Sequence, residues 1–459
     1  MPVHRNALSR DVRARIARTE EKRTQEPPYK RKRTRAADEP APVPEPVQAP
    51  SSPTAPKDRF TYNVPRDICD TPGYDPVPPD MRDSPAGRHI SAAELVRTSG
   101  ARYTPFFTDI EQPLVTLEYP ADAREEYLLV APQDKDEFDP IEELLAVVSA
   151  VAAFYVPEEQ RAAFGVVDDI EATAETPEEP ILRSLSKARN RRIGALFVSA
   201  VERYNARIRQ LREAGSLRRT IAHVGATFGV PERVWRTVQE QVYARVVAAH
   251  VDSLKRYEAF SDHVYGELLP PFLSEISRTM ALGPGSVFID LGSGIGNLLI
   301  QASLQSGCDA YGCEVMPAPA KLAQAQILQS TARWRMWGLR GGNHLESWCA
   351  DFTESDRVRS VLQNADVVLV NNYAFSPRTN DTLSLLFLDL KDGARIVSLR
   401  RFVPHDFRLT ERTLSSPMAI LSVEERTHTS GCVSWAASGG KYYVHTVDRS
   451  HVRAFAESG

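Results

Sequence analysis

The first half of the chain has the apolar spacing of helices. Between residues 193 and 211, apolar side chains recur three and four positions apart, which places them on one helix face. A second run of this kind, 231–254, opens with a proline, which the first turn of a helix accommodates. Two short apolar runs, 113–119 and 126–132, flank a polar turn and predict a β-hairpin. Residues 100–255 are therefore expected to form a mainly helical part that carries one small hairpin.

The second half changes to short apolar runs that alternate with helical segments. Strands are predicted at 287–290, 310–313, 366–370 and 395–399. A closing pair of strands, 434–435 and 442–447, is expected to be antiparallel at the sheet edge, with a tail over 451–459. Alternating strands and helices are typical of a mostly parallel sheet that is covered on both faces. Residues 256–450 therefore predict an α/β, Rossmann-like domain.

Composition separates the N-terminus from the rest of the 459 residues. Residues 40–85 hold 13 of the 33 prolines, and such a stretch cannot bury enough apolar surface to offset the entropy of ordering it. Residues 1–35 carry 12 Lys and Arg against 4 Asp and Glu, whereas the remainder carries 44 against 56. We expect residues 1–90 to be a largely disordered tail, basic and then Pro-rich, with order beginning near Tyr103.

The basic segment allows three interpretations. The run Lys30-Arg31-Lys32-Arg33, with Lys22-Arg23 upstream, is typical of a nuclear import signal. The wider segment would bind DNA phosphates with an affinity that depends on salt but not on sequence. The third interpretation is a solvated tail without a partner.

Several classes of protein are disfavoured. No stretch approaches the ~18 consecutive apolar residues of a membrane span. The N-terminus is Arg-rich and lacks the apolar core of a signal peptide, which argues against secretion. The five cysteines are widely spaced and form no CxxC pair, which argues against a zinc module and a disulfide framework. We expect a reduced, intracellular compartment and no metal site.

A glycine-rich turn follows the first predicted strand of the α/β part. Its sequence is Asp290-Leu-Gly292-Ser-Gly294-Ile-Gly296-Asn297, with GxGxG spacing rather than the GxGxxG of dinucleotide-binding turns. Asp290 suits a ligand with a positive amino group and would repel a pyrophosphate. Glu314 ends the next strand, where an acidic residue binds ribose hydroxyls. Together these features favour S-adenosylmethionine; the alternative is a structural glycine turn in another α/β protein.

Two further strand ends carry candidate chemistry. Asp351 would accept a hydrogen bond from an adenine amino group while Phe352 covers the ring. The loop Asn371-Asn-Tyr-Ala-Phe375 follows the fourth strand, at the edge where open α/β sheets bind ligands. An asparagine orients an amine nucleophile without holding it in a salt bridge, so this loop favours transfer to nitrogen; the alternative is an ordinary polar loop.

Five ordered motifs resemble the DOT (disruptor of telomeric silencing) family, the non-SET class of histone H3 lysine methyltransferases. They are Phe260-Ser-Asp-His-Val-Tyr265-Gly266-Glu267, Asp290-Leu-Gly-Ser-Gly, Gly312-Cys-Glu314, Val370-Asn-Asn-Tyr-Ala-Phe375, and Trp435 with Tyr442-Tyr-Val-His-Thr-Val-Asp. The similarity runs from about Val234 to Arg449, and the Ser438-Gly-Gly-Lys-Tyr-Tyr form resembles fungal members. Tyr373 replaces a Phe common in the family, and Leu268 replaces a Thr of animal members that hydrogen-bonds the cofactor.

The resemblance implies a class I S-adenosylmethionine-dependent fold and a set of site residues. The implied cofactor-binding residues are Tyr265, Gly266, Glu267, Asp290, Gly292, Gly294, Gly296, Asn297, Glu314, Asp351, Phe352 and Asn371. Asn371 would lie beside the transferred methyl group. A narrow lysine channel would be lined by Phe260, Phe375, Trp435 and Tyr442.

The resemblance also implies partners and a setting. A member of this family methylates a lysine in the globular core of histone H3 on nucleosomes, and acts in chromatin regulation, telomeric silencing and the DNA damage checkpoint. It works in the nucleus as a monomer, contacts nucleosomal DNA, here through the basic tail, and responds to ubiquitin on a neighbouring histone.

Two alternatives stay open at this point. A methyltransferase acting on RNA or on a small molecule would not need the Phe260–Glu267 loop or the C-terminal tyrosine pair, and both are present. A catalytically inactive chromatin-binding protein would be expected to lose the glycine turn, Glu314 or Asn371, and all are intact.

Overall fold

The computed structural model describes residues 64–82, 89–166, 179–254 and 266–458, which belong to one compact unit beginning at Phe60. The basic segment 1–35, and with it the three interpretations above, lies outside the described residues. Residues 64–82, which the proline content placed in a disordered tail, are instead ordered, and Ile68 is fully buried. Order therefore begins well before Tyr103, because this stretch is held by contacts that its own composition does not reveal.

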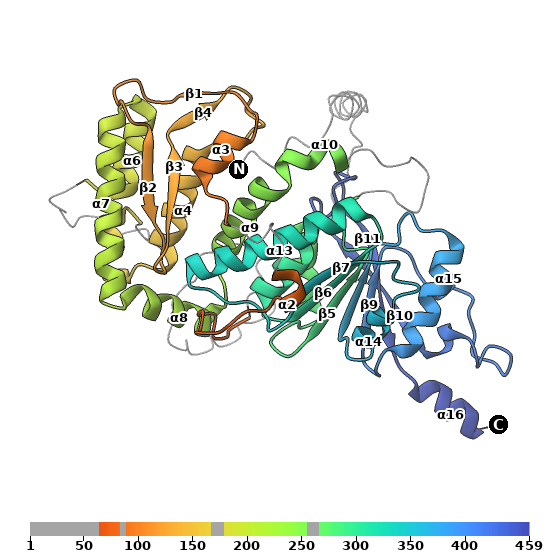
Figure 1. Ribbon diagram of the computed structural model, residues 1–459. Helices are drawn as coiled ribbons and strands as arrows, with labels where there is room; N and C mark the ends of the chain where they lie inside the picture. Colours follow the sequence, from red (N-terminus) through yellow and green to blue (C-terminus); the bar gives the residue numbers. More distant parts are fainter. Residues whose placement is uncertain (1–63, 83–88, 167–178, 255–265, 459) are drawn as a thin grey trace, which may run out of the picture. The chain divides into compact units, whose positions relative to one another are not determined.

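A seven-stranded sheet forms the centre of the second half, with the spatial order β7-β6-β5-β8-β9-β11-β10 (Figure 1). Its parallel strands are β5 (Val287–Leu291), β6 (Asp309–Glu314), β7 (Leu345–Cys349), β8 (Val367–Val370) and β9 (Arg395–Ser398). β11 (Gly440–Val447) runs antiparallel to both of its neighbours, β9 and β10 (Leu421–His428). The predicted α/β class, mostly parallel with an antiparallel pair at one edge, is confirmed.

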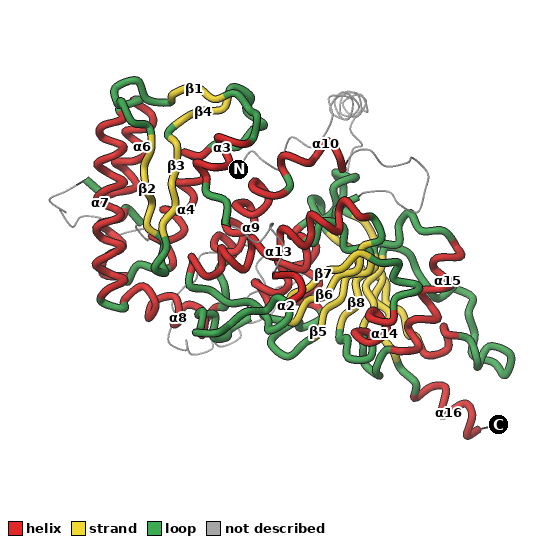
Figure 2. Tube along the Cα trace, viewed as in Figure 1, coloured by secondary structure: helices red, strands yellow, loops and turns green. Residues whose placement is uncertain are grey.

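Helices cover both faces of this sheet (Figure 2). The sheet separates two apolar cores, one on each face. Successive residues of a strand point into different cores: Phe288 of β5 and Val367 of β8 lie in one, and Ile289 and Val368 lie in the other. Strands buried on both faces are apolar at nearly every position, which made them visible in the sequence. The helices of this half are α11 (Pro270–Thr279), α12 (Asn297–Gln301), α13 (Pro317–Trp337), α14 (Asp356–Leu362), α15 (Pro377–Leu386) and α16 (Ser450–Ser458).

The first half is mainly helical and carries the expected hairpin. β2 (Leu114–Glu118) pairs antiparallel with β3 (Arg124–Leu128), while β1 (Tyr103–Pro105) pairs with β4 (Val130–Pro132). The helices are α2 (Pro79–Arg82), α3 (Ala92–Thr98), α4 (Pro140–Phe154), α5 (Arg161–Phe164), α6 (Ile181–Arg191), α7 (Gly194–Glu213), α8 (Ser216–Phe228), α9 (Glu232–Val246) and α10 (Val251–Leu254). One continuous apolar core includes side chains from this half and from α11, α12 and α13.

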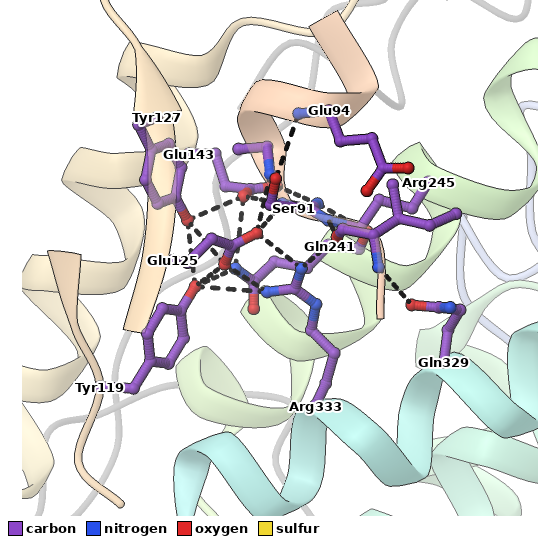
Figure 3. A network of polar contacts seen from close by, with 12 residues as sticks. Ser91, Glu94, Tyr119, Glu125, Tyr127, Glu143, Gln241, Arg245, Gln329 and Arg333 are labelled. Atoms are coloured by element: carbon purple, nitrogen blue, oxygen red, sulfur yellow. Dashed lines mark hydrogen bonds and ion pairs between the residues drawn. The ribbon is translucent and has the colours of Figure 1, made fainter. Parts of the chain in front are cut away.

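A buried group of four charged side chains joins the two halves (Figure 3). The Glu125 carboxylate on β3 accepts hydrogen bonds from Arg333 of α13 at 2.6 and 2.7 Å and from Arg245 of α9 at 2.8 Å. Arg245 also donates to Glu143 of α4, at 2.6 and 2.7 Å. Burial alone would raise the pKa of Glu125, but the two guanidinium groups outweigh it and hold that pKa well below its usual range.

Neutral groups complete this charge group. Tyr119 donates to Glu125 and Tyr127 donates to Glu143, while both guanidinium groups donate to the carbonyl of Ile90 at 3.0 Å. A buried ion pair needs partners for its remaining donors and acceptors, and here two carboxylates meet two guanidinium groups, with Arg333 Nε left without a hydrogen-bond partner among the described residues. The group therefore ties β3, α4 and α9 to α13 of the sheet domain.

Two sequence predictions near the C-terminus are wrong. The antiparallel partner of β11 is Leu421–His428, whereas 434–435 lie in a bend. Residues 450–458 form α16 rather than a tail. Between β8 and β9, α15 begins at Pro377, where the Ser376 side chain accepts the amide hydrogen of Thr379. Among the described residues, no helix combines the length and apolarity needed to cross a membrane.

Candidate active site

The glycine turn lies where the sheet reverses its strand order. After β5 the chain builds outward through β6 and β7, then returns to the other side of β5 as β8, so the loops after β5 and β8 diverge. Ligands of open α/β sheets bind in the crevice formed there. The turn requires glycine because Gly292, Gly294 and Gly296 all have positive φ angles, of 89°, 53° and 79°.

Two acidic residues lie beside this turn. Burial raises the pKa of Asp290 to about 8, and the neighbouring charge of Glu314 adds to the shift. Glu314 accepts the backbone N–H of Gly294 through one carboxylate oxygen and that of Met316 through the other, each at 2.8 Å. A buried carboxylate whose pKa is raised is a site that a cation would stabilise.

Aromatic rings line the next part of the crevice. Phe352, after β7, is buried and lies 5.9 Å from Phe375, centroid to centroid. A Cβ atom added to Gly292 would come 3.8 Å from the Phe375 ring, so this ring faces the glycine turn. Asp351 is exposed, and one of its oxygens accepts from the amide and the hydroxyl of Thr353. The turn, Phe352 and Phe375 therefore form one continuous wall.

The two asparagines after β8 have different roles. Asn371 donates from Nδ2 to the carbonyl of Gly266 at 3.1 Å, while its buried Oδ1 has no hydrogen-bond partner among the described residues. Asn372 is completely buried, and its amide makes four hydrogen bonds that tie this loop to Asn380 and to the chain after β9. A buried polar atom without a partner is costly unless a ligand or water meets it, so Asn371 points to a binding site.

The segment 266–269 reaches the site by pairing with 432–435. Glu267 and Ser434 exchange two hydrogen bonds, of 3.0 and 2.9 Å, and Leu269 donates to the Cys432 carbonyl. Gly266 lies so close to the Trp435 ring that a Cβ atom there would be 2.9 Å from it. Trp435 is 39% exposed, and its ring lies 5.8 Å from that of Tyr373, which is 53% exposed, with the two ring planes tilted by 30°.

Most of the predicted site residues come together, and one does not. Tyr442 is completely buried in the core against Phe272, and its hydroxyl donates to Glu275 at 3.0 Å. Burial and the Glu275 charge raise the pKa of Tyr442 to about 12. Its contacts are those of a core residue, so the structure does not support it as part of a channel. Phe260 and Tyr265 lie outside the described residues.

Asn297 and the rear of the glycine turn are held by two glutamines. Gln239 of α9 donates to the Asn297 carbonyl at 3.0 Å, and Gln326 of α13 donates to the Ile295 carbonyl and to the Asn297 side chain. Asn297 thus supports the turn from behind. Sequence reasoning missed these glutamines, which carry no local signal, and it noted Tyr373 in the Asn371–Phe375 loop without assigning it to the site.

The fold and these residues define the class of protein. A parallel sheet with one reversed strand, a GxGxG turn after the central strand and acidic residues ending two adjacent strands characterise class I S-adenosylmethionine-dependent methyltransferases. The site fits that cofactor, since a buried carboxylate with a raised pKa suits its amino group and the orphaned Asn371 oxygen lies in the same crevice. Among the described residues, no cluster of His, Cys, Asp and Glu is arranged to hold a metal ion.

The comparisons identify the family. The family described as histone methylation protein DOT1 matches residues 243–447. Histone-lysine N-methyltransferases, H3 lysine-79 specific, are similar over most of the chain: that of Mycosarcoma maydis is 41% identical, covering 86% of this chain and 67% of the relative. That of Yarrowia lipolytica is 35% identical, covering 85% and 79%. The chain belongs to the DOT1 histone methylation family.

The solved structures that match this chain are more distant. An RNA methyltransferase from Salinibacter ruber in complex with S-adenosyl-L-homocysteine is 22% identical, with a TM-score of 0.28 over 40% of this chain and 95% of that one. An O-methyltransferase from Bacillus cereus is 12% identical, with a TM-score of 0.30 over 49% and 96%.

Proposed function

We propose that this protein transfers a methyl group from S-adenosylmethionine to a lysine in the globular core of histone H3 within the nucleosome. The proposal is supported by the Asn371 side chain at the carboxyl end of β8, whose buried Oδ1 has no hydrogen-bond partner among the described residues and would orient an amine. The curated relatives, named as specific for lysine 79 of histone H3, support the same substrate. Such a substrate implies that the enzyme acts on chromatin in the nucleus.

The chain's own residues would hold the cofactor at the edge of the sheet. Asp290 would pair with the amino group, and Glu314, which accepts the backbone N–H groups of Gly294 and Met316 at the end of β6, would accept the ribose hydroxyls. Phe352 would cover the adenine, with Asp351 at its amino group, while Phe375 beside it would line the lysine channel, and Gly266 and Glu267 would close the other side. When bound, S-adenosylmethionine supplies an electrophilic methyl group on a sulfonium centre.

The substrate lysine would enter beside Trp435 and Tyr373, which stack at the exposed mouth of the site. The amine must be neutral to attack, and an aromatic, water-poor surrounding disfavours its ammonium form. Aromatic faces still attract the methylated cation of the product. Asn371 would fix the direction of the amine, and a large part of the rate enhancement then comes from in-line positioning.

Docking would draw on parts of the chain beyond the site. The basic segment 1–35 would contact nucleosomal DNA through its 12 Lys and Arg residues, in addition to any role in nuclear import. A ubiquitin on a neighbouring histone is a further proposed partner, and the enzyme is proposed to act as a monomer.

The test is methyl transfer from labelled S-adenosylmethionine to intact nucleosomes, free histones and RNA in parallel. The proposal expects label in histone H3 of nucleosomes and little in free histone. Label in RNA alone, or none in H3, would reject the proposed substrate. The Gly292→Arg variant, which places a long side chain into the cofactor turn, is the negative control and should lose cofactor binding.

A further inference from the structure

The exposed mouth of the site carries an ordered stack that ends in an arginine. The Trp435 ring lies against Gly266, Tyr373 stacks on Trp435, and the Arg400 guanidinium lies 5.2 Å from the Tyr373 ring centroid. Gly266 in turn accepts the Asn371 side chain, so the stack begins at the residue that would orient the amine. Arg400 therefore lies at the outer end of a chain of contacts that starts at Asn371.

The backbone of Arg400 is held as firmly as its side chain. The Asn372 carboxamide accepts from the Arg400 N–H at 2.8 Å and donates to the Arg400 carbonyl at 3.1 Å. That carbonyl also accepts the Ser398 hydroxyl at 2.8 Å. Since Asn372 is fully buried next to Asn371, one residue fixes both the loop after β8 and the position of Arg400.

The charge of Arg400 has no acidic partner within the described part of the chain. The residue is exposed, and the contact made by its guanidinium is the face of Tyr373. The next residue, Arg401, is different: it donates to the Val403 carbonyl, contacts the His405 ring nitrogen and lies over Tyr443. Two adjacent arginines thus face different surroundings, and only Arg400 belongs to the stack at the mouth.

We infer that Arg400 is a specificity-determining residue that binds a carboxylate next to the target lysine on the substrate surface. A guanidinium pre-positioned by stacking loses little freedom when it pairs with a carboxylate, and its fork can hold both oxygens. The enzyme would thereby select lysines that have an acidic neighbour at the distance set by the stack. This inference rests on the proposed function, because it assigns part of the substrate to the same site.

The experiment compares Arg400→Gln and Arg400→Glu with Arg401→Glu as a matched control. Each variant receives intact nucleosomes and labelled S-adenosylmethionine, and kcat and KM are measured at several salt concentrations. The affinity for S-adenosyl-L-homocysteine is measured separately, without nucleosomes. We expect kcat/KM to fall about tenfold in Arg400→Gln and further in Arg400→Glu, mainly through KM, with a weaker salt dependence. Arg401→Glu should stay within about twofold of the wild type.

A charge exchange identifies the partner. Nucleosomes are prepared in which each acidic histone residue near the target lysine is changed singly to lysine, and one of them should restore activity to Arg400→Glu while impairing the wild type. Any of three results overturns the inference. Arg400→Glu and Arg401→Glu lose activity equally, the Arg400 variants lose S-adenosyl-L-homocysteine binding, or no changed nucleosome restores activity to Arg400→Glu. If the wild type labels no nucleosomal H3, the proposed function fails, and this inference falls with it.

Discussion

Cofactor binding should depend steeply on pH because of Asp290. Burial raises the pKa of this carboxyl group to about 8, and the charge of Glu314 adds to the shift. If Asp290 pairs with the cofactor's amino group, binding requires the ionised form, so a proton must leave the free site at pH values below 8. Since a group with a pKa of 8 is about one-eleventh ionised at pH 7 and about one-hundredth at pH 6, the apparent Kd should rise about 50-fold between pH 8 and pH 6.

The assay is calorimetric titration with S-adenosyl-L-homocysteine in buffers of different ionisation enthalpy. At pH 7 the wild type should release about 0.9 proton for each ligand bound, following from the same pKa. The Asp290→Asn variant cannot ionise, so its affinity at pH 8 should be far below that of the wild type and should not change between pH 8 and pH 6. Asp351→Asn removes an exposed carboxyl group and should keep the pH dependence. A wild-type Kd that is flat over this range, with no proton release, would refute the role of Asp290.

Three further predictions concern other parts of the molecule. Glu125→Gln leaves two buried guanidinium groups facing one carboxylate and should lower the free energy of unfolding, measured with guanidinium chloride, by about 3–5 kcal/mol. Glu424→Gln breaks a surface ion pair and should change this free energy little. Similar unfolding midpoints for the two variants would contradict the structural role of Glu125. Asn371→Ala should keep the Kd of S-adenosyl-L-homocysteine but lose most turnover on nucleosomes, and unchanged kcat would remove its proposed role. Deletion of residues 1–35 should weaken nucleosome binding and reduce its salt dependence in gel-shift titrations; identical salt slopes would exclude the DNA contact.

The central strands and their loops could be predicted because local sequence determines them. β5 and β8 are apolar at nearly every position since both faces are buried, and an acidic or amide residue at or directly after the last positions of such a strand must lie near the carboxyl edge. β10 escaped detection because it pairs on one side only and exposes charged residues, Glu424 among them. Its pattern is that of a polar segment, and only pairing with β11 makes it a strand.

The parts that failed depend on contacts between distant residues. Tyr442 lies in the same strand as Tyr443, and alternation along a strand says that they face opposite ways but not which one faces the site. Residues 64–82 look disordered by composition, yet backbone hydrogen bonds at Arg66, Asp70 and Arg340 secure them to α8 and to the chain after α13. Arg400 carries no local signal, since its orientation follows from Asn372 and Tyr373.

The buried charge group has a consequence for how this family is divided into domains. The region recognised by the family model begins at residue 243, so it contains Arg245 and Arg333 but neither Glu125 nor Glu143. A fragment cut at that point would lose both carboxylates together with β3, α4 and most of α9, and would expose to water the apolar core that these elements share with α11, α12 and α13. The homologous region is therefore not an autonomous folding unit, and natural variation at any one of these four positions should be constrained by the other three.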